Sequence, residues 1–171
     1  MTDLATRRLV IDARNRLSAA ARQVLGLGLL GGMIRAARRS GFGAIVVLAD
    51  AGEIDHLRPL LIDEAAVAIV PAVPTAPKST VTARVPADLV GERSWLEQLA
   101  TETAPNGTRR GEGTDILLFN ADATPGQIAA ADTGSTGAPI VFETPPLRMA
   151  DEGDRKPAEQ RLLKGLIKDS D

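Results

Sequence analysis

The stretch that most constrains the fold runs from Gly26 to Asp50, because it joins a helical pattern to a buried strand pattern. Apolar residues recur at helical spacing over Leu29–Ala37, and Gly41 and Gly43 then supply stop and turn signals. The residues Ala44–Leu48 are continuously apolar and rich in β-branched side chains. Such a run is typical of a strand covered on both faces, as in the parallel sheets of α/β domains. The stretch therefore predicts a helix that leads into a parallel strand.

Apolar or alternating runs and helical patterns follow one another along the rest of the chain. The strand-like runs are 8–12, 67–73, 79–85, 115–119 and 140–142. The helical patterns are 52–61, the segment after Asp88, 124–131 and 158–167. Between them, 106–113 is expected to be a turn-rich connector with solvated Arg109 and Arg110. The alternation predicts an α/β fold of three layers, with a mostly parallel, mixed sheet and helices on both faces.

Composition narrows the classes of partner. The 171 residues suit one domain with a substantial core. With one Trp, three Phe and no Tyr, the chain lacks the aromatic platform that single-stranded nucleic acid needs, and a net charge of −2 provides no phosphate-backbone footprint. The absence of Cys excludes disulfides and thiolate ligands. We see no secretory signal and no apolar run of membrane-spanning length, so we expect a cytoplasmic domain that binds no nucleic acid.

Two stretches resemble sugar-phosphate nucleotidyltransferases, in the same order along the chain. The segment 26–47 is similar to the family's glycine-and-leucine turn, first crossover helix and second strand. Val85-Pro86-Ala87-Asp88-Leu89-Val90, followed by Trp95-Leu96, is similar to the family's strand-end carboxylate motif, which holds the divalent metal. The resemblance implies a nucleotidyltransferase (Rossmann-like) fold, with CTP and Mg²⁺ as cofactors if the domain is active.

The end of the chain has a second resemblance. Residues 158–171 resemble the junction helix of bifunctional proteins that join a cytidylyltransferase-like domain to a membrane-embedded CDP-alcohol phosphatidyltransferase domain. This implies a nucleotidyltransferase-like domain at 1–143, a linker or arm at 144–157, and a junction helix at 158–171 that leads to a membrane domain. The implied partners are that membrane domain and, through an apolar edge at 162–167, a second copy of the chain in a homodimer. The implied location is cytoplasmic and membrane-associated.

One segment departs from the family pattern. Active members follow the first strand with a glycine-rich loop and a Pro-Lys pair, because backbone N–H groups and cations must approach the triphosphate. Here Asp12 is followed by Ala13-Arg14-Asn15-Arg16-Leu17-Ser18, no glycine precedes Gly26, and the 22–25 stretch contains no Lys. The departure favours a catalytically degenerate domain that serves dimerisation, stability or regulation of a phosphatidyltransferase. The alternative is an active CTP-dependent sugar- or inositol-phosphate cytidylyltransferase.

Four residues are candidates for the site, three from the resemblance and Asp122 from its place after the strand-like run 115–119. Asp88 and Asp122 are the candidate Mg²⁺ ligands, since hard cations prefer carboxylate oxygens. Arg14 and Arg16 stand where the family has its phosphate-contacting arginine, and a guanidinium fork suits phosphate. Each has a structural alternative. The aspartates fit turn or helix-capping positions, and the arginines fit a solvated loop.

Three further features have a surface interpretation beside a functional one. Lys78 is either an anion contact or an exposed loop residue, and His56, the sole histidine, has no partners for general-base chemistry. Arginines 35, 38 and 39 form a stripe on one helix face. The stripe is either solvated or directed at anionic lipid headgroups on a nearby membrane surface.

Overall fold

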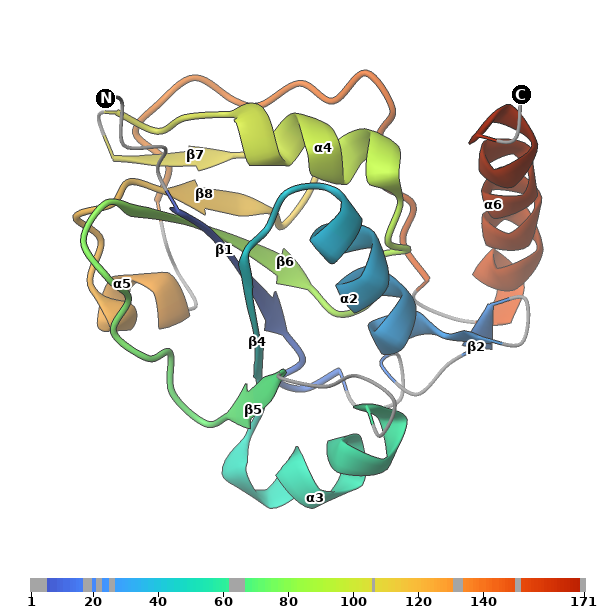
Figure 1. Ribbon diagram of the computed structural model, residues 1–171, viewed down its shortest axis with the longest axis horizontal. Helices are drawn as coiled ribbons and strands as arrows, with labels where there is room; N and C mark the ends of the chain where they lie inside the picture. Colours follow the sequence, from blue (N-terminus) through green and yellow to red (C-terminus); the bar gives the residue numbers. More distant parts are fainter. Residues whose placement is uncertain are drawn as a thin grey trace.

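A six-stranded mixed sheet forms the centre of the molecule (Figure 1). The structure is a computed structural model that describes residues 6–16, 20, 23–24, 27–61, 67–105, 107–130, 134–149 and 152–169. The strands β1 (Thr6–Asp12), β4 (Ala44–Leu48), β5 (Ala68–Val70) and β6 (Thr80–Pro86) pair in parallel. Strand β8 (Leu117–Phe119) pairs antiparallel with β6, and the edge strand β7 (Thr108–Arg110) pairs antiparallel with β8. The order β5-β4-β1-β6-β8-β7 confirms the predicted mostly parallel, mixed sheet.

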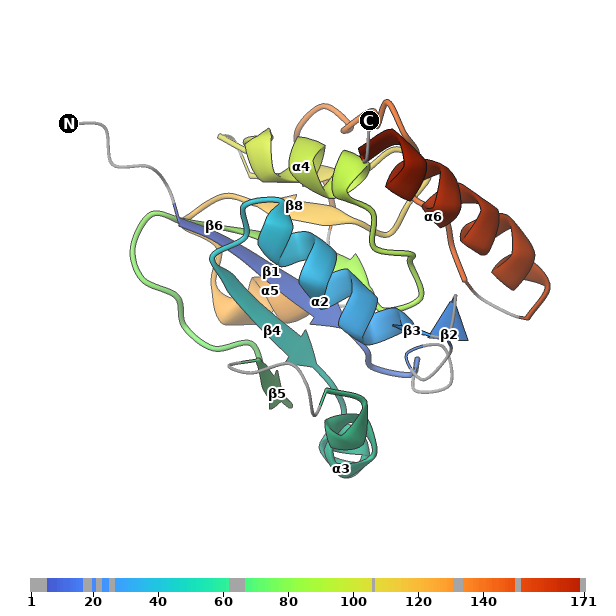
Figure 2. The same ribbon diagram turned by 45° about the vertical axis from the view of Figure 1, so that its right-hand side comes forward.

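Helices cover both faces of the sheet, as predicted (Figure 2). The helices α2 (Leu29–Arg39) and α4 (Arg93–Thr101) pack on one face, and the short α5 (Pro125–Ala129) packs on the other. Strand β1 shows the alternation that this requires, because Leu9 and Ile11 join the core under α2 and α4 while Val10 joins the cluster under α5. The sheet is therefore buried on both faces at its centre.

The remaining elements are short or peripheral. The segment that the helical spacing at 52–61 predicts is divided into η1 (Ala51–Glu53), α3 (Ile54–Leu57) and η2 (Arg58–Leu61), where Pro59 falls within the last piece. A small hairpin pairs β2 (Gln23–Val24) with β3 (Leu27–Gly28) just before α2. The described chain closes with η3 (Glu152–Asp154) and α6 (Arg155–Asp169).

Helix α2 and strand β4 form as the opening stretch predicts. Leu29, Leu30, Met33, Ile34 and Ala37 are buried along one face of α2. The helix ends at Ser40, whose hydroxyl donates to the carbonyl of Ala36, and Gly41 then turns the chain at a φ of +108°. A positive φ is costly for residues with a Cβ, so glycine suits this turn.

Two local predictions are wrong. Residues 108–110 form the edge strand β7 rather than a connector, and Arg109 is bonded along it rather than solvated. The expected strand at 140–142 is reduced to a single bridge between Ile140 and Gly111. Phe142 instead packs edge-on against Trp95, with ring centroids 6.2 Å apart. The polar segment 108–110 becomes a strand by pairing with β8, whereas the apolar segment 140–142 has only one bridge to a neighbouring strand, so tertiary pairing overrides the local signal in both places.

The segment after residue 144 is fastened to the domain at its centre. The Val90 N–H donates to the carbonyl of Leu147 over 2.8 Å, and the Met149 N–H donates to the carbonyl of Asp88 over 2.6 Å. Met149 is fully buried. The part of the expected arm at 147–149 is thus held against the loop after β6, while the domain boundaries at 143 and 157 stay predictions.

Helix α6 is attached to the domain through an ion pair. The Arg161 Nε lies 2.9 Å and 3.0 Å from the two carboxylate oxygens of Glu92, and Arg161 also donates to the carbonyl of Pro145. The Glu92 carboxylate is 11% exposed. Within the described residues, no helix has both the length and the apolar character that crossing a membrane requires.

The buried face of α4 provides a test of the core. Leu99 is fully buried among Trp95, Leu96 and the sheet, so Leu99→Ala is expected to lower the free energy of unfolding by about 2–5 kcal/mol. Urea titration followed by the fluorescence of Trp95 measures the change. Val141→Ala, at a side chain that is 63% exposed, is the control and should stay within about 0.5 kcal/mol of the parent. Equal effects of the two substitutions would contradict this packing.

A second test concerns the attachment of α6. Burial raises the pKa of Glu92, and Arg161 opposes that shift. A raised native pKa means that the contribution of Glu92 to stability is greatest below its unfolded pKa and is lost as the pH rises through the native pKa. Arg161→Met should therefore cost about 1–3 kcal/mol at pH 7, where Glu92 is left buried and unpaired, and clearly less below pH 4.5, where it is neutral.

Urea titrations at the two pH values measure this difference. Lys164→Met, an exposed position on the same helix, is the matched control and should show no pH-dependent loss. A loss in Arg161→Met that is the same at both pH values would contradict the ion pair.

Candidate functional site

The candidate site lies where the strand order reverses. Strand β1 pairs with β4 on one side and with β6 on the other, so the carboxyl ends of all three strands meet at one edge of the sheet. There the Ala13 N–H donates to the carbonyl of Leu48 over 2.8 Å, and the Ala87 N–H donates to the carbonyl of Asp12 over 3.0 Å. Ligands of open α/β sheets bind in the crevice at such a switch point. The loops after Asp12 and after Val85, which contain the candidate residues Arg14, Arg16 and Asp88, both lie at this crevice.

The Arg14 side chain is paired with a carboxylate at the start of its own loop. Its guanidinium forms a fork on the Asp12 carboxylate, with Nε 3.0 Å from Oδ1 and Nη2 3.1 Å from Oδ2. Nη2 also donates to the carbonyl of Ala129 over 2.9 Å, at the end of α5. Asn15 follows at a φ of +59° and turns the loop. Arg14 thus ties the loop after β1 to α5.

Arg84 anchors the same helix from inside the sheet. This β6 side chain is buried, and its Nη1 donates to the carbonyls of Ile128 and Ala130 over 2.6 Å and 2.7 Å. Together with Arg14, it satisfies three consecutive carbonyls at the carboxyl end of α5, where a helix leaves acceptors without partners. The role of both residues here is structural.

The pKa of Arg84 shows that positive charge gathers at this edge. Burial lowers the pKa of its guanidinium, and the carboxylate of Asp12 opposes the shift. The positive charges of Arg14, Arg110 and Arg16 act in the same direction as burial. Arg14, Arg16 and Arg110 therefore each lie within electrostatic range of Arg84, which favours anionic ligands nearby.

Asp88 is buried in the loop after β6 and is held by cations. Its exposed fraction is 4%. Arg148 Nε donates to Oδ2 over 2.7 Å, and Arg16 Nε lies 3.9 Å from the same oxygen. The hydrogen bond to Asp88 raises the pKa of Arg148. The other oxygen, Oδ1, is buried and accepts no hydrogen bond from the described residues.

A cleft of about 380 Å³ opens beside Asp88. Its walls are the loop after β6, the turn between β7 and β8, and the segment that carries Arg148. The charged and hydroxyl side chains that line it are Asp88, Arg110, Thr114, Asp115 and Arg148. Arg110 Nη1 lies 3.7 Å from the carboxylate of Asp115. The cleft is polar and carries both signs of charge.

Asp122 lies far from this cleft along the sheet. Strand β8 runs antiparallel to β6, with Phe119 opposite Thr82 and Leu117 opposite Arg84. The residues after Phe119 therefore lie at the amino end of β6, whereas Asp88 follows its carboxyl end. Asp122 is exposed in a turn where its N–H donates to the Asn120 side chain. The structure does not bring the two candidate metal ligands together.

The donor set at Asp88 does not fit a divalent metal. Mg²⁺ needs carboxylate or phosphate oxygens around it, and a neighbouring guanidinium repels it. Asp88 offers one unpaired oxygen, and Arg148 and Arg16 face the other. In the part of the chain that the structure describes, no group of three or more His, Cys, Asp or Glu side chains is placed to hold a metal.

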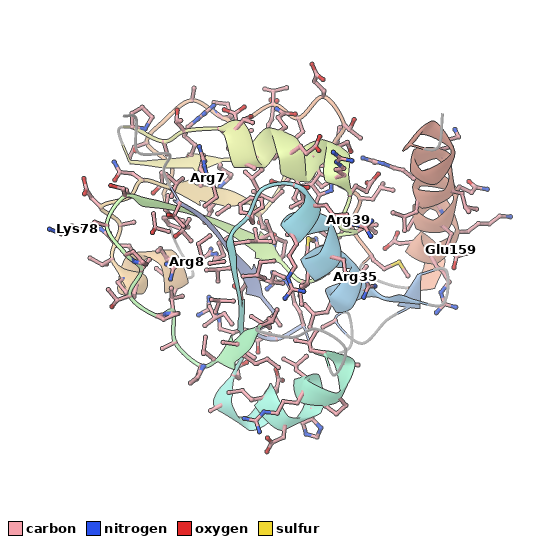
Figure 3. The ribbon with its side chains drawn as sticks, viewed as in Figure 1. Arg7, Arg8, Arg35, Arg39, Lys78 and Glu159 are labelled. Atoms are coloured by element: carbon pink, nitrogen blue, oxygen red, sulfur yellow. The ribbon has the colours of Figure 1, made fainter. Side chains whose placement is uncertain are left out.

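The remaining residues nominated from sequence lie on the surface. His56 and Lys78 are exposed. Arg35 and Arg39 lie along α2 (Figure 3), with Arg35 half-buried and Arg38 and Arg39 exposed. Much of the loop between Ala13 and α2, including Leu17, Ser18, Arg22 and Leu25, lies outside the described residues.

Sequence reasoning missed three arginines of the site. Arg84 and Arg110 belong to strands, where a charged residue reads as an edge or solvent position, and Arg148 lies in a segment expected to be a linker. A usable signal exists for Arg84. It stands between the apolar residues Ala83 and Val85 in an alternating strand of a sheet that is predicted to have helices on both faces. A sheet covered on both faces would bury this guanidinium, which would then need backbone partners.

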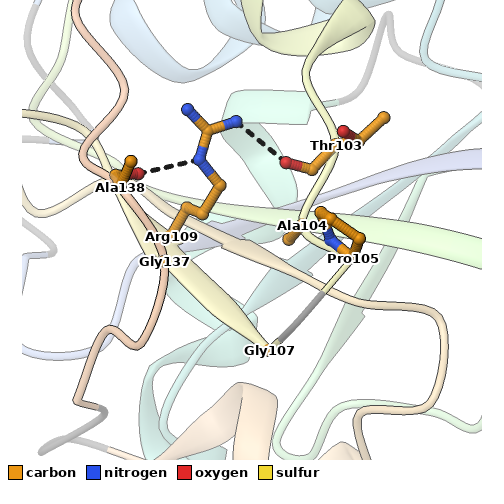
Figure 4. A pocket seen from close by; sticks show the side chains of 7 residues that line it. All are labelled: Thr103, Ala104, Pro105, Gly107, Arg109, Gly137 and Ala138. Atoms are coloured by element: carbon orange, nitrogen blue, oxygen red, sulfur yellow. Dashed lines mark hydrogen bonds between the residues drawn. The ribbon is translucent and has the colours of Figure 1, made fainter.

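A second hollow, of about 290 Å³, lies beside α4 and β7 (Figure 4). Arg109 spans it, donating to the carbonyls of Ala138 and Thr103 over 2.8 Å and 2.9 Å. It also pairs with the Glu102 carboxylate over 2.8 Å. A Cβ on Gly137 would come within 2.7 Å of Arg109 Cγ, so the arginine packs tightly on the glycine. The arginine that lines this hollow is therefore engaged in structural contacts.

Comparison with known proteins establishes the fold. No protein-family model and no curated protein matches the sequence. A nucleotidyl transferase of Methanothermobacter is similar in structure with a TM-score of 0.71 and 11% identity, covering 93% of this chain and 98% of the other. A 4-diphosphocytidyl-2C-methyl-D-erythritol synthase of Anaerococcus prevotii is similar with a TM-score of 0.62 and 10% identity, covering 92% and 98% of the two chains.

A further solved 4-diphosphocytidyl-2C-methyl-D-erythritol synthase has a TM-score of 0.66 and 12% identity, with 94% and 100% of the two chains covered. At these identities the likeness concerns the fold. The chain has a nucleotidyltransferase-like α/β fold, as the sequence predicts.

The anchoring of α5 gives a prediction for this region. Arg84→Met keeps roughly the volume of the side chain but removes the guanidinium that donates to the carbonyls of Ile128 and Ala130, so stability should fall by about 1–3 kcal/mol. Hydrogen exchange of the α5 amides should accelerate more than exchange in α4. Lys78→Met, at an exposed position, is the control for loss of one positive charge. If α5 exchanges at the parent rate in Arg84→Met, the anchoring role is excluded.

Proposed function

We propose that the chain is a catalytically degenerate nucleotidyltransferase-like domain that supports a CDP-alcohol phosphatidyltransferase. One observation carries the proposal. The carboxylate at the position of the family's metal ligand, Asp88, is bound by Arg148 Nε at 2.7 Å. Arg14, the candidate phosphate contact, is likewise forked onto Asp12. Two groups that catalysis would need are satisfied within the protein itself.

The phosphatidyltransferase context rests on the C-terminal resemblance. Helix α6 contains residues 158–169 of the segment that resembles the junction helix, and the ion pair of Arg161, near the middle of the helix, with Glu92 attaches it to the domain. A domain held in this way can orient or stabilise a membrane enzyme that follows it. Homodimerisation, with Leu163 exposed on α6, and proximity of the α2 arginines to an anionic membrane surface belong to the same proposal.

An active CTP-dependent cytidylyltransferase is the second candidate. It is favoured by Asp88 Oδ1, which is buried and accepts no hydrogen bond from the described residues. It is also favoured by the printed names of two structural neighbours, which are synthases of a diphosphocytidyl sugar alcohol. In that case substrate binding would have to displace Arg148 from Asp88, so that the carboxylate could meet Mg²⁺ and the nucleotide phosphates.

Enzyme assays separate the two candidates. With CTP, Mg²⁺ and a panel of sugar, inositol and polyol phosphates, we expect no pyrophosphate release above that of Asp88→Asn. Calorimetric titration of CTP should show no gain in affinity when Mg²⁺ is added. A bona fide cytidylyltransferase assayed in parallel controls for the substrates. Pyrophosphate release that Asp88→Asn abolishes, or Mg²⁺-dependent micromolar CTP binding, would establish the active alternative.

A further inference from the structure

The chain changes from core packing to surface contacts just after Phe142. The Phe142 ring packs edge-on against Trp95 in the main core. The Gln98 side chain, on α4, donates to the carbonyl of Val141 over 2.7 Å and accepts from the N–H of Glu143 over 3.1 Å. The chain then bends at Glu143 and at the residue after it. Helix α4 therefore holds the chain up to this bend.

Beyond the bend, residues 145–149 and helix α6 lie on the outside of the domain, and we call them together the strap. The backbone of Leu147 and Met149 forms an antiparallel bridge with the loop after β6. Helix α6 lies beside β2 (Figure 1 and Figure 2). The strap thus spans the loop after β6 and the hairpin that precedes α2.

The apolar contacts of the strap form a small cluster of their own. Its members come from the strap, from the start of α2 and from the loop after β6, and they are Leu29, Val90, Met149 and Ala158, with the partly buried Leu147 and Leu162. This cluster is distinct from the larger core cluster beneath α2 and α4. Separation of the strap from the domain would break the small cluster and leave the main core in place.

The charged contacts of the strap lie where water reaches one partner. The Arg148 side chain is 60% exposed, whereas that of its partner Asp88 is 5% exposed. The Arg161 side chain is 24% exposed beside Glu92. Ion pairs open to solvent contribute little to stability, and a buried carboxylate regains hydration when the group that covers it leaves. Opening of the strap therefore costs much less than unfolding of the domain.

We propose that the strap opens as one unit about the bend at Glu143 while the six-stranded sheet stays folded, and that its closed position covers Asp88. Pro146 and Arg148 line the cleft beside Asp88, so opening removes one wall of the cleft and frees the carboxylate. A partner that draws α6 away from the domain thereby changes the site at the end of β6. Pyrophosphate release bears on the proposed function alone, because the strap is a property of the fold in either case.

The absence of cysteine from the chain allows a test with single introduced thiols. Met149→Cys places a thiol beneath the strap, and Val47→Cys places one in the main core, both at fully buried positions. Reaction with an aromatic disulfide reagent under native conditions measures how often each position opens. We expect position 149 to react at least about tenfold faster than position 47, since local opening costs less than global unfolding. Its rate should also depend less on urea, because strap opening exposes less surface.

The substitution Leu99→Ala separates strap opening from global unfolding. It weakens the main core, which stays folded while the strap opens. The reaction at position 47 should accelerate at least about tenfold, and the reaction at position 149 should not change.

The substitution Arg161→Met tests whether α6 and residues 145–149 move together. It leaves Glu92 unpaired in the closed position but hydrated in the open one, so position 149 should react at least about fivefold faster. Lys164→Met, exposed on the same helix, is the matched control and should have no effect.

Hydrogen exchange in the unaltered protein provides a measurement that needs no substitution. The amides of Val90 and Met149 bond across the strap and the loop after β6. They should exchange at similar opening free energies, faster than the amides of β1 and β6 and with a weaker urea dependence.

Three results would overturn the proposal. Equal acceleration at positions 47 and 149 by Leu99→Ala, or exchange of the Val90 and Met149 amides only through global unfolding, would show that the strap does not open by itself. An unchanged reaction at position 149 in Arg161→Met would show that α6 detaches independently of residues 145–149.

Discussion

Strand β1 is the element on which the rest of the structure depends. It forms parallel ladders with β4 and β6 on its two sides, and Leu9, Val10 and Ile11 are fully buried. Because both edges of β1 are paired, a shift of its register by one residue would break both ladders and move each side chain to the opposite face of the sheet. This fixes the end of β1 beside the end of β6, with Asp12 opposite Pro86. The two loops that carry Arg14 and Asp88 are neighbours for this reason.

The two faces of the sheet are covered unequally, and this explains the buried arginines. Helices α2 and α4 cover one face with a large apolar core, whereas α5 on the other face has only five residues. On that thinner side Arg8 donates to Thr82 and to the carbonyl of Pro74, and Arg84 donates to the end of α5. Their aliphatic stems fill space that a longer helix would fill, while backbone carbonyls satisfy the guanidinium groups.

The sequence was most informative where one strong periodic pattern coincided with burial. The helix and strand of the Gly26–Asp50 stretch, the capping box of Thr124 with Gln127, and the buried face of α4 were all predictable. The polar edge strand β7 was not, because three residues with two arginines carry no strand signal without their partner strand. The opposite placement of Asp122 follows from the antiparallel direction of β8, which spacing along the chain does not reveal.

The Asp88–Arg148 contact was beyond sequence reasoning, since 60 positions separate the two residues. The segment that carries Arg148 also connects the cleft to the terminal helix. Arg148 lies between Leu147 and Met149, whose backbone groups bond to the loop of Asp88, and the same segment leads through Pro145 and Arg161 to the hold on α6. A ligand that draws Arg148 from Asp88 removes one of the contacts that fasten this segment. The cleft and the terminal helix are thus joined by a short run of backbone and ion-pair contacts, and a change at the cleft has a physical route to α6.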